Sequence, residues 1–478
     1  MKTLLLNPPS FEYFDGGAGS RYPARREIHS FWYPTWLAYP AGLIQGSRLL
    51  DAPSHGFSPE ETIRLSAEYD FVVIFTSTPG FQSDIRLAEM MKAAKPSLKI
   101  AFVGPHVTVL PEESLKTSSA IDFIVRKEFD YAVAEFAWGK KIAEIAGTSF
   151  WKNGQIFHNP DPPLIEDLDA LPFAVDTYKR DLDITKYNIP FFHYPYISFY
   201  TSRGCPAQCT FCLWPQTMCS HRWRTRSSDN VIAETRRARE LFPQAKEIVF
   251  DDDTFTIGKS RVLELCQKLK PLKITWSCNS RATTDYETLK AMKGAGCRLL
   301  VVGFESGDPA ILKNIKKGIT IEQSLAFMKN CRRLGLEVHG DFQIGLPGET
   351  RETIEKTMRF AKQLDPETIQ VSMSHPYPGT ELYQYLKDQG YFISATMTDD
   401  LGHQLPSFQY PDLSRGEIVK AVEDFYARYY FRPRIILRIV GRALFSSTDR
   451  RRLYQEGKEF FRLRAKRRGF IRSSKIEG

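Results

Sequence analysis

The sequence predicts an α/β protein with three parts: a doubly wound parallel sheet, a partial barrel of six parallel β/α units, and a small, mostly helical C-terminal region. Three observations lead to this prediction. Apolar strand-like runs alternate with amphipathic stretches over the first 140 residues, the alternation resumes near residue 193, and it stops near residue 390. Because the second series contains no hairpin signal, its strands are expected to run parallel.

The first series indicates a Rossmann-like domain over residues 1–140, with helices on both faces of its sheet. In such a sheet, ligands bind beyond the carboxyl ends of the strands. Five runs predict the strands: KTLLLN, RLLDA, FVVIFTS, KIAFVG and DFIVRKE. Four of their ends read NPPS, DAPSHG, TSTPG and GPHVT, so topology alone makes a cofactor site plausible there.

Residues 141–192 contain KNGQIFHNPDPPLIEDLDALP, whose content of Pro, Asp and Asn indicates a linker. The partial barrel is predicted over residues 193–390 and the helical region over 391–478. Six runs predict the barrel strands: YISFYTS, EIVFDD, ITWSCN, RLLVVGFE, VHGDFQIG and TIQVSMS.

Charge is concentrated at the C-terminus. Residues 431–478 contain 15 Lys and Arg against 4 Asp and Glu, although the whole chain of 478 residues has a net charge of only +9. Basic residues interleaved with aromatic and aliphatic ones, as in FYARYYFRPRIILRIVGRALF, suit the headgroup boundary of an anionic membrane. RNA binding and an ordinary solvated helix are the alternatives.

The chain is expected to be cytoplasmic. No apolar run reaches the length that spans a bilayer, and the opening MKTLLLNPPS has too short an apolar stretch for a signal peptide. Of the eight cysteines, three are clustered and five are scattered, which is unlike a secreted disulfide scaffold.

The clustered cysteines are Cys205, Cys209 and Cys212, spaced C-x3-C-x2-C in a loop after the first barrel strand. Thiolates spaced in this way can bind a metal. One interpretation is a structural zinc site completed by Cys219 or His221. The other is a [4Fe-4S] cluster with three thiolate ligands and one iron open to a small molecule. The spacing alone leaves both open.

The position of the cysteines favours the cluster. Active sites in parallel barrels form at the carboxyl ends of the strands, and a structural zinc site would not require other polar groups to gather there. Polar signals follow each of the next five strands: Asp251 to Asp253, Asn279 and Arg281, Glu305, Gly345 to Glu349, and His375.

The segments CPAQCTFC, FDDDTF, GFESG, GLPGET and HPYPGTELY resemble the radical S-adenosylmethionine (SAM) enzymes over roughly residues 195–390. The resemblance implies that Cys205, Cys209 and Cys212 hold a [4Fe-4S] cluster whose open iron binds SAM. Reduction then cleaves SAM to a 5′-deoxyadenosyl radical, so an electron donor such as a flavodoxin or ferredoxin is an expected partner.

The resemblance also assigns residues to contacts with SAM. It identifies no amino-acid side chain that takes part in catalysis. Asp252 and Asp253 are expected near the methionine amino group. Asn279, Arg281 and Glu305 are expected near the ribose and methionine, with a structural Arg281–Glu305 ion pair as the alternative. Gly345, Gly348 and Glu349 are expected near adenine, where glycine lets the backbone approach a flat base.

The runs KIAFVGPHVTVLPEE and IVRKEFDYAV resemble the cobalamin-binding subfamily of these enzymes. The resemblance implies a cobalamin cofactor, and the candidates for contacting its nucleotide tail or corrin edge are Ser77, Thr78, Gly104, Val107 and Thr108. The Asp-x-His-x-x-Gly motif of classical cobalamin carriers is absent, and NPPS stands in its place. A histidine below cobalt is therefore not expected, and His55 is not nominated. The alternative is a vestigial or protein-binding domain.

The overall pattern, over nearly the whole length and particularly in the opening segment from MKTLLLNPPS to LAYPAGLI, most resembles the hopanoid-biosynthesis radical SAM protein J group, the bacteriohopanetetrol cyclitol ether synthases. The resemblance implies a lipid-linked sugar substrate and contraction of its glucosamine ring. His375 and Tyr377 are candidates for the substrate side.

The alternatives are a cobalamin-dependent methyltransferase, an anaerobic tetrapyrrole cyclase and, outside enzymes, a zinc-stabilised membrane adaptor. Peripheral contact with the inner face of the membrane is expected through the C-terminal region, and nucleic acid is not an expected partner.

Overall fold

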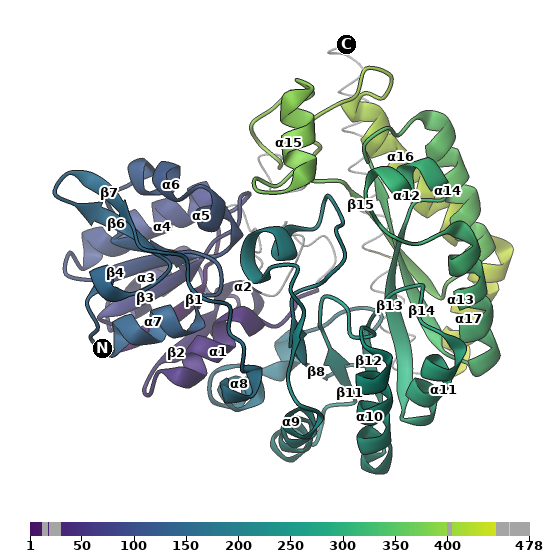
Figure 1. Ribbon diagram of the computed structural model, residues 1–478, viewed down its shortest axis with the longest axis horizontal. Helices are drawn as coiled ribbons and strands as arrows, with labels where there is room; N and C mark the ends of the chain where they lie inside the picture. The colour runs from purple at the N-terminus through teal and green to yellow at the C-terminus, as the bar shows by residue number, and fades with distance from the viewer. Residues whose placement is uncertain (12–17, 19–29, 399–403, 446–457, 459–478) are drawn as a thin grey trace.

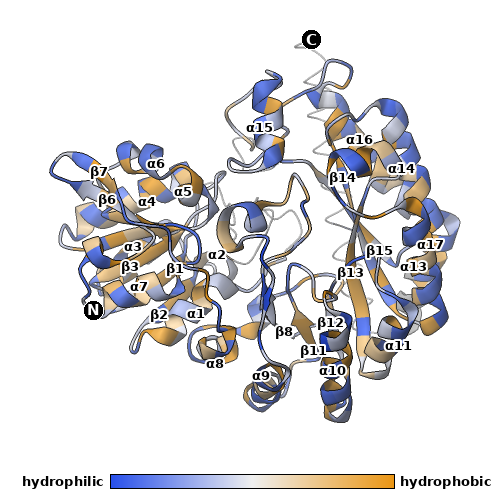
Figure 2. Cartoon of the chain, in the orientation of Figure 1, coloured by the Kyte–Doolittle hydropathy of each residue, from blue (hydrophilic) through white to orange (hydrophobic). Residues whose placement is uncertain are grey.

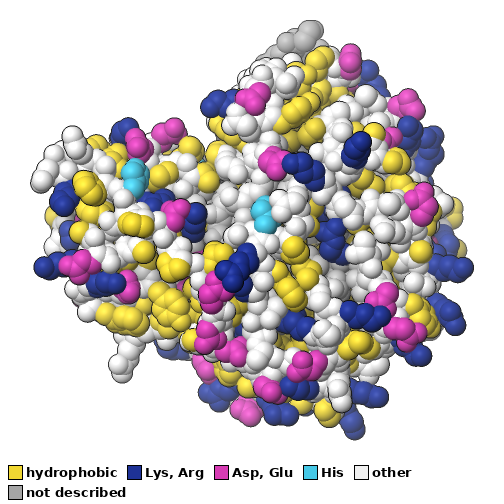
Figure 3. Space-filling view, viewed as in Figure 1, with side chains coloured by type: hydrophobic (Ala, Val, Ile, Leu, Met, Phe, Trp, Pro, Cys, Tyr) yellow, Lys and Arg dark blue, Asp and Glu magenta, His cyan; other side chains and the backbone are white. Residues whose placement is uncertain are grey.

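The computed structural model describes residues 1–11, 18, 30–398, 404–445 and 458. The N-terminal α/β domain lies beside the six-stranded sheet of the barrel, and the chain between them runs along the side of both (Figure 1). Strands of both sheets are largely hydrophobic, whereas the surrounding helices carry both polar and apolar residues (Figure 2). Acidic and basic side chains are interspersed over the face seen in Figure 3.

The N-terminal sheet has seven strands in the order β2-β1-β3-β4-β5-β6-β7. The five predicted runs form the parallel part of this sheet, β1 to β5, so the predicted α/β class is confirmed. The strands are β1 (Thr3–Asn7), β2 (Arg48–Asp51), β3 (Phe71–Phe75), β4 (Lys99–Val103), β5 (Phe123–Val125), β6 (Thr148–Lys152) and β7 (Gln155–His158).

Both faces of this sheet are buried. In β1, Leu5 belongs to one hydrophobic cluster, whereas Leu4 and Leu6 belong to a second. A parallel sheet covered on both faces explains why its strands are continuous apolar runs. The covering helices are α1 (Thr35–Leu43), α2 (Ala52–His55), α3 (Pro59–Ser66), α4 (Phe81–Ala94), α5 (Pro105–Val109), α6 (Pro111–Thr117) and α7 (Asp130–Ala137).

The linker prediction for residues 141–192 is wrong at its start, because β6 and β7 form an antiparallel hairpin that extends the sheet. The turn between them contains Asn153 and Gly154, with φ values of 51° and 78°. Asn-Gly with two positive φ values is a strong hairpin signal, which the abundance of polar residues around it masked.

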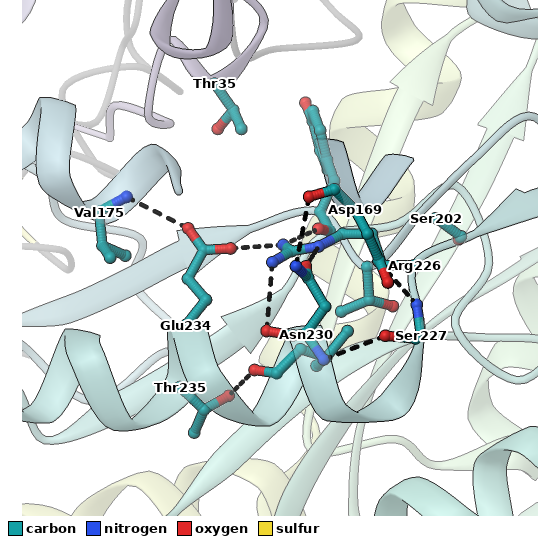
Figure 4. Close-up of polar contacts among 12 residues, drawn as sticks. Thr35, Asp169, Val175, Ser202, Arg226, Ser227, Asn230, Glu234 and Thr235 are labelled. Atoms are coloured by element: carbon teal, nitrogen blue, oxygen red, sulfur yellow. Dashed lines mark hydrogen bonds and ion pairs between the residues drawn. The ribbon is translucent and has the colours of Figure 1, made fainter. Parts of the chain in front are cut away.

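The later part of the predicted linker is packed against both neighbours. Helix α8 (Ala174–Asp181) contacts α1 and the barrel helix α9 (Ser228–Leu241). Glu234 of α9 forms a buried ion pair with Arg226 and accepts a hydrogen bond from the backbone N–H of Val175 at 3.2 Å (Figure 4). Asp169 accepts a hydrogen bond from the N–H of Ser227 at 2.8 Å. This segment therefore fixes the barrel to the N-terminal domain.

The barrel sheet contains six strands in the order β15-β14-β13-β12-β11-β8, all parallel, as predicted. The strands are β8 (Tyr196–Phe199), β11 (Glu247–Phe250), β12 (Trp276–Ser280), β13 (Cys297–Glu305), β14 (Glu337–Ile344) and β15 (Thr368–Met373). The two short strands β9 (Ser202–Arg203) and β10 (Arg224–Thr225) pair antiparallel beside the cysteine loop. The helices are α9, α10 (Lys259–Leu269), α11 (Tyr286–Gly294), α12 (Pro309–Asn314), α13 (Ile321–Leu334), α14 (Arg351–Leu364) and α15 (Glu381–Asp388).

The open edge of the barrel is covered by α16 (Arg415–Tyr430). The hydroxyls of Tyr426 and Tyr430 accept hydrogen bonds from the backbone N–H groups of Val371 and Ile369 in β15, at 2.8 and 3.0 Å. These contacts satisfy donors that an edge strand would otherwise expose. Helix α17 (Pro433–Phe445) follows. In the described part of the chain, no helix is long and apolar enough to cross a bilayer.

Candidate active site

The barrel encloses a cavity of about 220 Å³ between the cysteine loop and strands β12 to β15. Its walls include the side chains of Cys205, Cys209 and Cys212 from the loop. Asn279, Glu305 and other polar residues line it from the strands. The structure thus brings together residues that lie more than a hundred positions apart in the sequence, as expected for a site at the carboxyl ends of parallel strands.

The cysteine loop is held by its own backbone and by Gln216. The N–H of Cys212 donates to the carbonyl of Cys209 at 3.1 Å. The side-chain amide of Gln216 donates to the carbonyls of Cys209 and Cys212 at 3.2 and 2.8 Å. Burial raises the pKa of the Cys205 thiol, so a bound metal would be needed to keep it as a thiolate.

The three thiols fit a cluster with an open iron better than a zinc site. No other cysteine among the described residues lines the cavity. The thiol of Cys219 lies 3.7 Å from a carboxylate oxygen of Asp253, and Nδ1 of His221 lies 3.0 Å from the carbonyl oxygen of Cys205.

Within the described ranges, no three His, Cys, Asp or Glu side chains lie close enough together to hold a metal ion, and this includes the three cysteines. The loop nevertheless presents three thiols to one cavity with room for a further ligand, which suits a site-differentiated cluster.

The two predicted aspartates after β11 have different positions, one at the cavity and one in the hydrogen-bonded framework of the barrel. Asp253 lines the cavity, but Asp252 does not. The Asp252 carboxylate accepts hydrogen bonds from the backbone N–H groups of Thr201 and Ser202, the latter at 2.9 Å, and burial raises its pKa. Asp252 therefore fixes the chain just before the cysteine loop, and of the two predicted aspartates only Asp253 can contact a ligand in the cavity.

Asn279, near the end of β12, and Arg281, just after that strand, both line the cavity. Asn279 donates to a carboxylate oxygen of Asp251 at 3.1 Å, and Arg281 donates to the carbonyl of Lys317 at 2.6 Å. The alternative of an Arg281–Glu305 ion pair is not what the structure has, because Glu305 pairs with the ammonium of Lys317 at 2.7 Å.

Glu305 lies at a β-bulge, and its backbone φ is 62°. This conformation turns its carboxylate back over Gly303. A β-carbon on Gly303 would lie 2.2 Å from Oε1 of Glu305 and 2.7 Å from Nζ of Lys317. Gln343 donates to the other carboxylate oxygen at 3.0 Å. Burial acts to lower the pKa of Lys317, but the Glu305 carboxylate and the nearby Cys209 together raise it above its usual value.

The GLPGE loop after β14 does not line this cavity. Gly345 and Gly348 have φ values of 91° and 83°, as glycine allows. Glu349 accepts hydrogen bonds from the N–H groups of Gly345 and Leu346, and burial raises its pKa to about 8. The ring of Phe408 lies 3.1 Å from where a β-carbon of Gly345 would be. The Glu349 carboxyl group thus holds the backbone of its own loop in place. The contact of this loop with adenine stays a prediction.

Comparisons with known proteins agree with this geometry. Residues 199–361 match the radical SAM superfamily, and residues 23–137 match the B12 binding domain. An uncharacterized methyltransferase of Pyrococcus horikoshii is 30% identical over 456 residues, covering 92% of this chain and 94% of that protein.

This chain belongs to the cobalamin-binding radical SAM enzymes.

Its cofactors are accordingly a [4Fe-4S] cluster, SAM and cobalamin. The anaerobic magnesium-protoporphyrin IX monomethyl ester cyclase of Rubrivivax gelatinosus is 26% identical, with 90% of this chain and 77% of that protein covered. The solved structure of the cobalamin-dependent radical SAM enzyme OxsB, with aqua-cobalamin and SAM bound, has the same fold, with a TM-score of 0.70 and 15% identity. That match covers 96% of this chain and 71% of OxsB.

The cobalamin candidates of this radical SAM enzyme follow β3 and β4. Ser77 is buried, and its hydroxyl has no hydrogen-bond partner among the described residues. The Thr78 hydroxyl lies 3.2 Å from Nδ1 of His106. An orphaned hydroxyl just beyond a strand end fits a polar ligand such as the cobalamin tail.

The other three candidates have structural partners. Gly104 has a φ of 112°, and a β-carbon there would lie 2.3 Å from the carbonyl oxygen of Thr76. Val107 is fully buried in the hydrophobic core, and Thr108 accepts a hydrogen bond from the N–H of Lys127 at 3.0 Å. Packing alone accounts for Gly104 and Val107, so their contact with cobalamin stays a prediction.

Several cavity residues were not predicted. Asp341 and Gln343 of β14 and Gln370 and Ser372 of β15 face the cavity at alternate positions. The polar residues at every second position of VHGDFQIG and TIQVSMS were an available signal. No comparable sequence pattern indicates that Lys317, which follows α12, lines the cavity.

His375 and Tyr377 line a small adjoining cavity of about 30 Å³, which shares Cys212 and Gln343 with the main one. The loop that carries them also touches the N-terminal domain. A β-carbon on Gly379 would lie 2.5 Å from a methyl carbon of Val109 in α5. The two candidates therefore lie where the barrel meets the cobalamin-binding domain.

Proposed function

We propose that this radical SAM enzyme contracts the glucosamine ring of a membrane lipid of the bacteriohopanetetrol glucosamine type, which gives the cyclitol ether. One structural observation carries the proposal: a wall of polar side chains lies in the same cavity as the three cysteines. The resemblance of the opening segment to the hopanoid-biosynthesis group and the basic apolar helix α17 add support from outside the cavity.

The polar wall consists of two cross-strand pairs. In the register of β14 and β15, Asp341 is opposite Gln370, and Gln343 is opposite Ser372. All four side chains line the cavity. Together they offer hydrogen-bond donors and acceptors on one face, which suits a ligand with several hydroxyls. A broad apolar macrocycle would instead favour an apolar wall.

The bound cluster and SAM supply the radical that removes one hydrogen from the substrate. The residues of the chain hold the reacting groups in place. The Glu305–Lys317 pair and Gln343 form a buried network at the cavity wall. Phe211 and Phe342 contribute apolar side chains to the same wall. Ring contraction is an isomerisation, because the bond between the anomeric carbon and the ring oxygen breaks, a new carbon–carbon bond closes the smaller ring and the ring oxygen becomes a hydroxyl. When 5′-deoxyadenosine is released with the abstracted hydrogen, one electron from the reductant and one proton replace that hydrogen.

Methyl transfer is the second candidate, and the name of the Pyrococcus horikoshii relative favours it. A methylated product gains the mass of one methylene group, whereas a contracted ring leaves the mass unchanged and alters chromatographic retention. Product mass therefore separates the two.

The test is an anaerobic incubation of reconstituted protein with SAM, a reductant and the glucosamine lipid. We expect iron, sulfide and cobalt in the protein, 5′-deoxyadenosine in the reaction and an isomer of the lipid. Cys205→Ala, Cys209→Ala and Cys212→Ala should lose both products. Cys266→Ala is the matched control, because Cys266 is buried in α10 away from the cavity. Formation of a heavier, methylated lipid would replace ring contraction with methyl transfer.

A further inference from the structure

We propose that Asp341, which lies beside His339, is the residue that recognises the substrate through a cationic amine, so that the cavity selects amino sugars over neutral sugars. The inference rests on the proposed function and adds the residue that would select the amine. It follows from the position of one carboxylate in the cavity wall, from the groups beside it and from the absence of a basic side chain paired with it among the described residues.

Asp341 lies in β14 and is open to the cavity, with its side chain 33% exposed. Nε2 of His339, two residues earlier and almost fully buried, lies 3.3 Å from Oδ1 of Asp341 without forming a hydrogen bond to it. The ring of His339 is fixed on two other sides. Its Nδ1 lies 2.7 Å from the Thr368 hydroxyl, and the Phe191 ring stacks on it with centroids 3.8 Å apart. The fixed imidazole therefore lies beside one side of the carboxylate, and the other side is open to the cavity.

The cavity does not neutralise Asp341 with a basic side chain. Among the described residues, no Lys or Arg lies within ion-pair distance of it. Glu305 is different, because Lys317 and Gln343 occupy both of its oxygens at 2.7 and 3.0 Å. A carboxylate that is partly withdrawn from water gains most from a cationic partner. Asp341 is therefore suited to pair with an ammonium group.

The surroundings of Asp341 suit an amine that lies next to hydroxyls. On one side its register partner is Gly303, and the Glu305 carboxylate and the Lys317 ammonium fill the space that a side chain there would take. On the other side its partner is Gln370, whose amide donates to the Ser372 hydroxyl at 3.1 Å. An amine at Asp341 would therefore place neighbouring hydroxyls against Gln370 and Ser372, which is the pattern of an amino sugar.

The test compares two soluble probes, an alkyl glucosaminide and the corresponding alkyl glucoside, on the holoenzyme. Equilibrium binding and probe-stimulated formation of 5′-deoxyadenosine are measured for wild type and Asp341→Asn. We expect wild type to prefer the amine by at least about tenfold, the scale of one charged contact. Asp341→Asn should lose the preference by weakening binding of the amine while binding of the glucoside stays unchanged. Asp341→Glu should recover part of it.

The matched control is Asp412→Asn, at an exposed position outside the cavity. A retained preference for the amine in Asp341→Asn would overturn the inference, and so would an equal loss of binding for both probes, which indicates a structural role. The proposed function fails separately. If the amine probe binds through Asp341 but the lipid yields no isomer, the amine site stands and ring contraction does not.

Discussion

At the scale of the residue, the site depends on where side chains are absent as much as on where they are present. Gly303 lies at a bulge of β13, and the carboxylate of Glu305 and the ammonium of Lys317 occupy the space above it. Glu305 can fold back in this way because its backbone takes a positive φ of 62°. Such strain in a residue other than glycine is retained where the surroundings hold it, and it is common at functional sites.

Gly303→Ala should therefore displace the Glu305–Lys317 pair, because the new methyl group would lie 2.2 Å from the carboxylate oxygen. We expect binding of SAM to weaken by about tenfold, equivalent to roughly 1.4 kcal/mol, with the protein still folded. Isothermal titration with SAM on the reconstituted enzyme measures this. Gly294→Ala is the control, since a β-carbon there meets no atom within 4 Å. Equal affinities in the two variants would contradict the role given to Gly303.

At the scale of the element, α17 stands out by the side chains that it leaves exposed. Ile436, Leu437 and Val440 are 43%, 72% and 47% exposed, whereas Ile435 is buried. The sequence of the helix, PRIILRIVGRALF, contains arginines and no acidic residue. Apolar side chains flanked by arginines suit the interface of an anionic bilayer, which is where a lipid-linked substrate would be met.

Replacing Leu437 with Ser should reduce sedimentation of the protein with vesicles that contain phosphatidylglycerol. Burial of one leucine is worth about 1.5–3 kcal/mol, so the partition coefficient should fall by roughly tenfold or more. Raising the salt concentration should weaken binding of the wild type, because the arginines contribute through charge. Trp138→Ser, at a 60% exposed site on the N-terminal domain, should bind as wild type does. RNA binding that survives Leu437→Ser, without any vesicle binding, would favour the nucleic-acid alternative.

At the scale of the whole molecule, buried ion pairs join the two α/β domains next to the cysteine loop. Arg203, two residues before Cys205, makes a bidentate pair with Asp130 of α7, with both N–O distances 2.8 Å. Arg224 of β10 pairs with Glu128 of the N-terminal domain. One hydrophobic cluster also includes residues of both domains. The loop that carries the three cysteines is therefore positioned by the N-terminal domain as well as by the barrel.

Asp130→Asn should destabilise the protein by at most about 3–5 kcal/mol, because it leaves the buried Arg203 charge with only the more distant carboxylate of Glu128, at 3.9 Å. Urea denaturation of the apoprotein measures the change. Asp176→Asn is the control, because Asp176 and its partner Arg237 are 48% and 45% exposed and such a pair contributes at most about 1 kcal/mol. Similar losses in the two variants would show that the interdomain pair has no special weight.

The sequence by itself predicted the succession of strands along the chain, and it singled out three cysteines that the structure places at one cavity. Both signals lie within short stretches of sequence, namely apolar runs such as FVVIF and the spacing C-x3-C-x2-C. It also placed the polar residues at the strand ends, because parallel strands bring their carboxyl ends to one edge. The Asn153-Gly154 hairpin was equally local, but the polar residues around it indicated a linker.

Only the tertiary structure decided which polar residues face the cavity. Asp252 and Asp253 are adjacent and chemically alike, yet one binds backbone amides and the other lines the cavity. Lys317, for example, reaches Glu305 from the segment after α12. Such contacts depend on side-chain direction and on segments distant in the sequence. The packing of the whole chain sets both, and no local pattern encodes them.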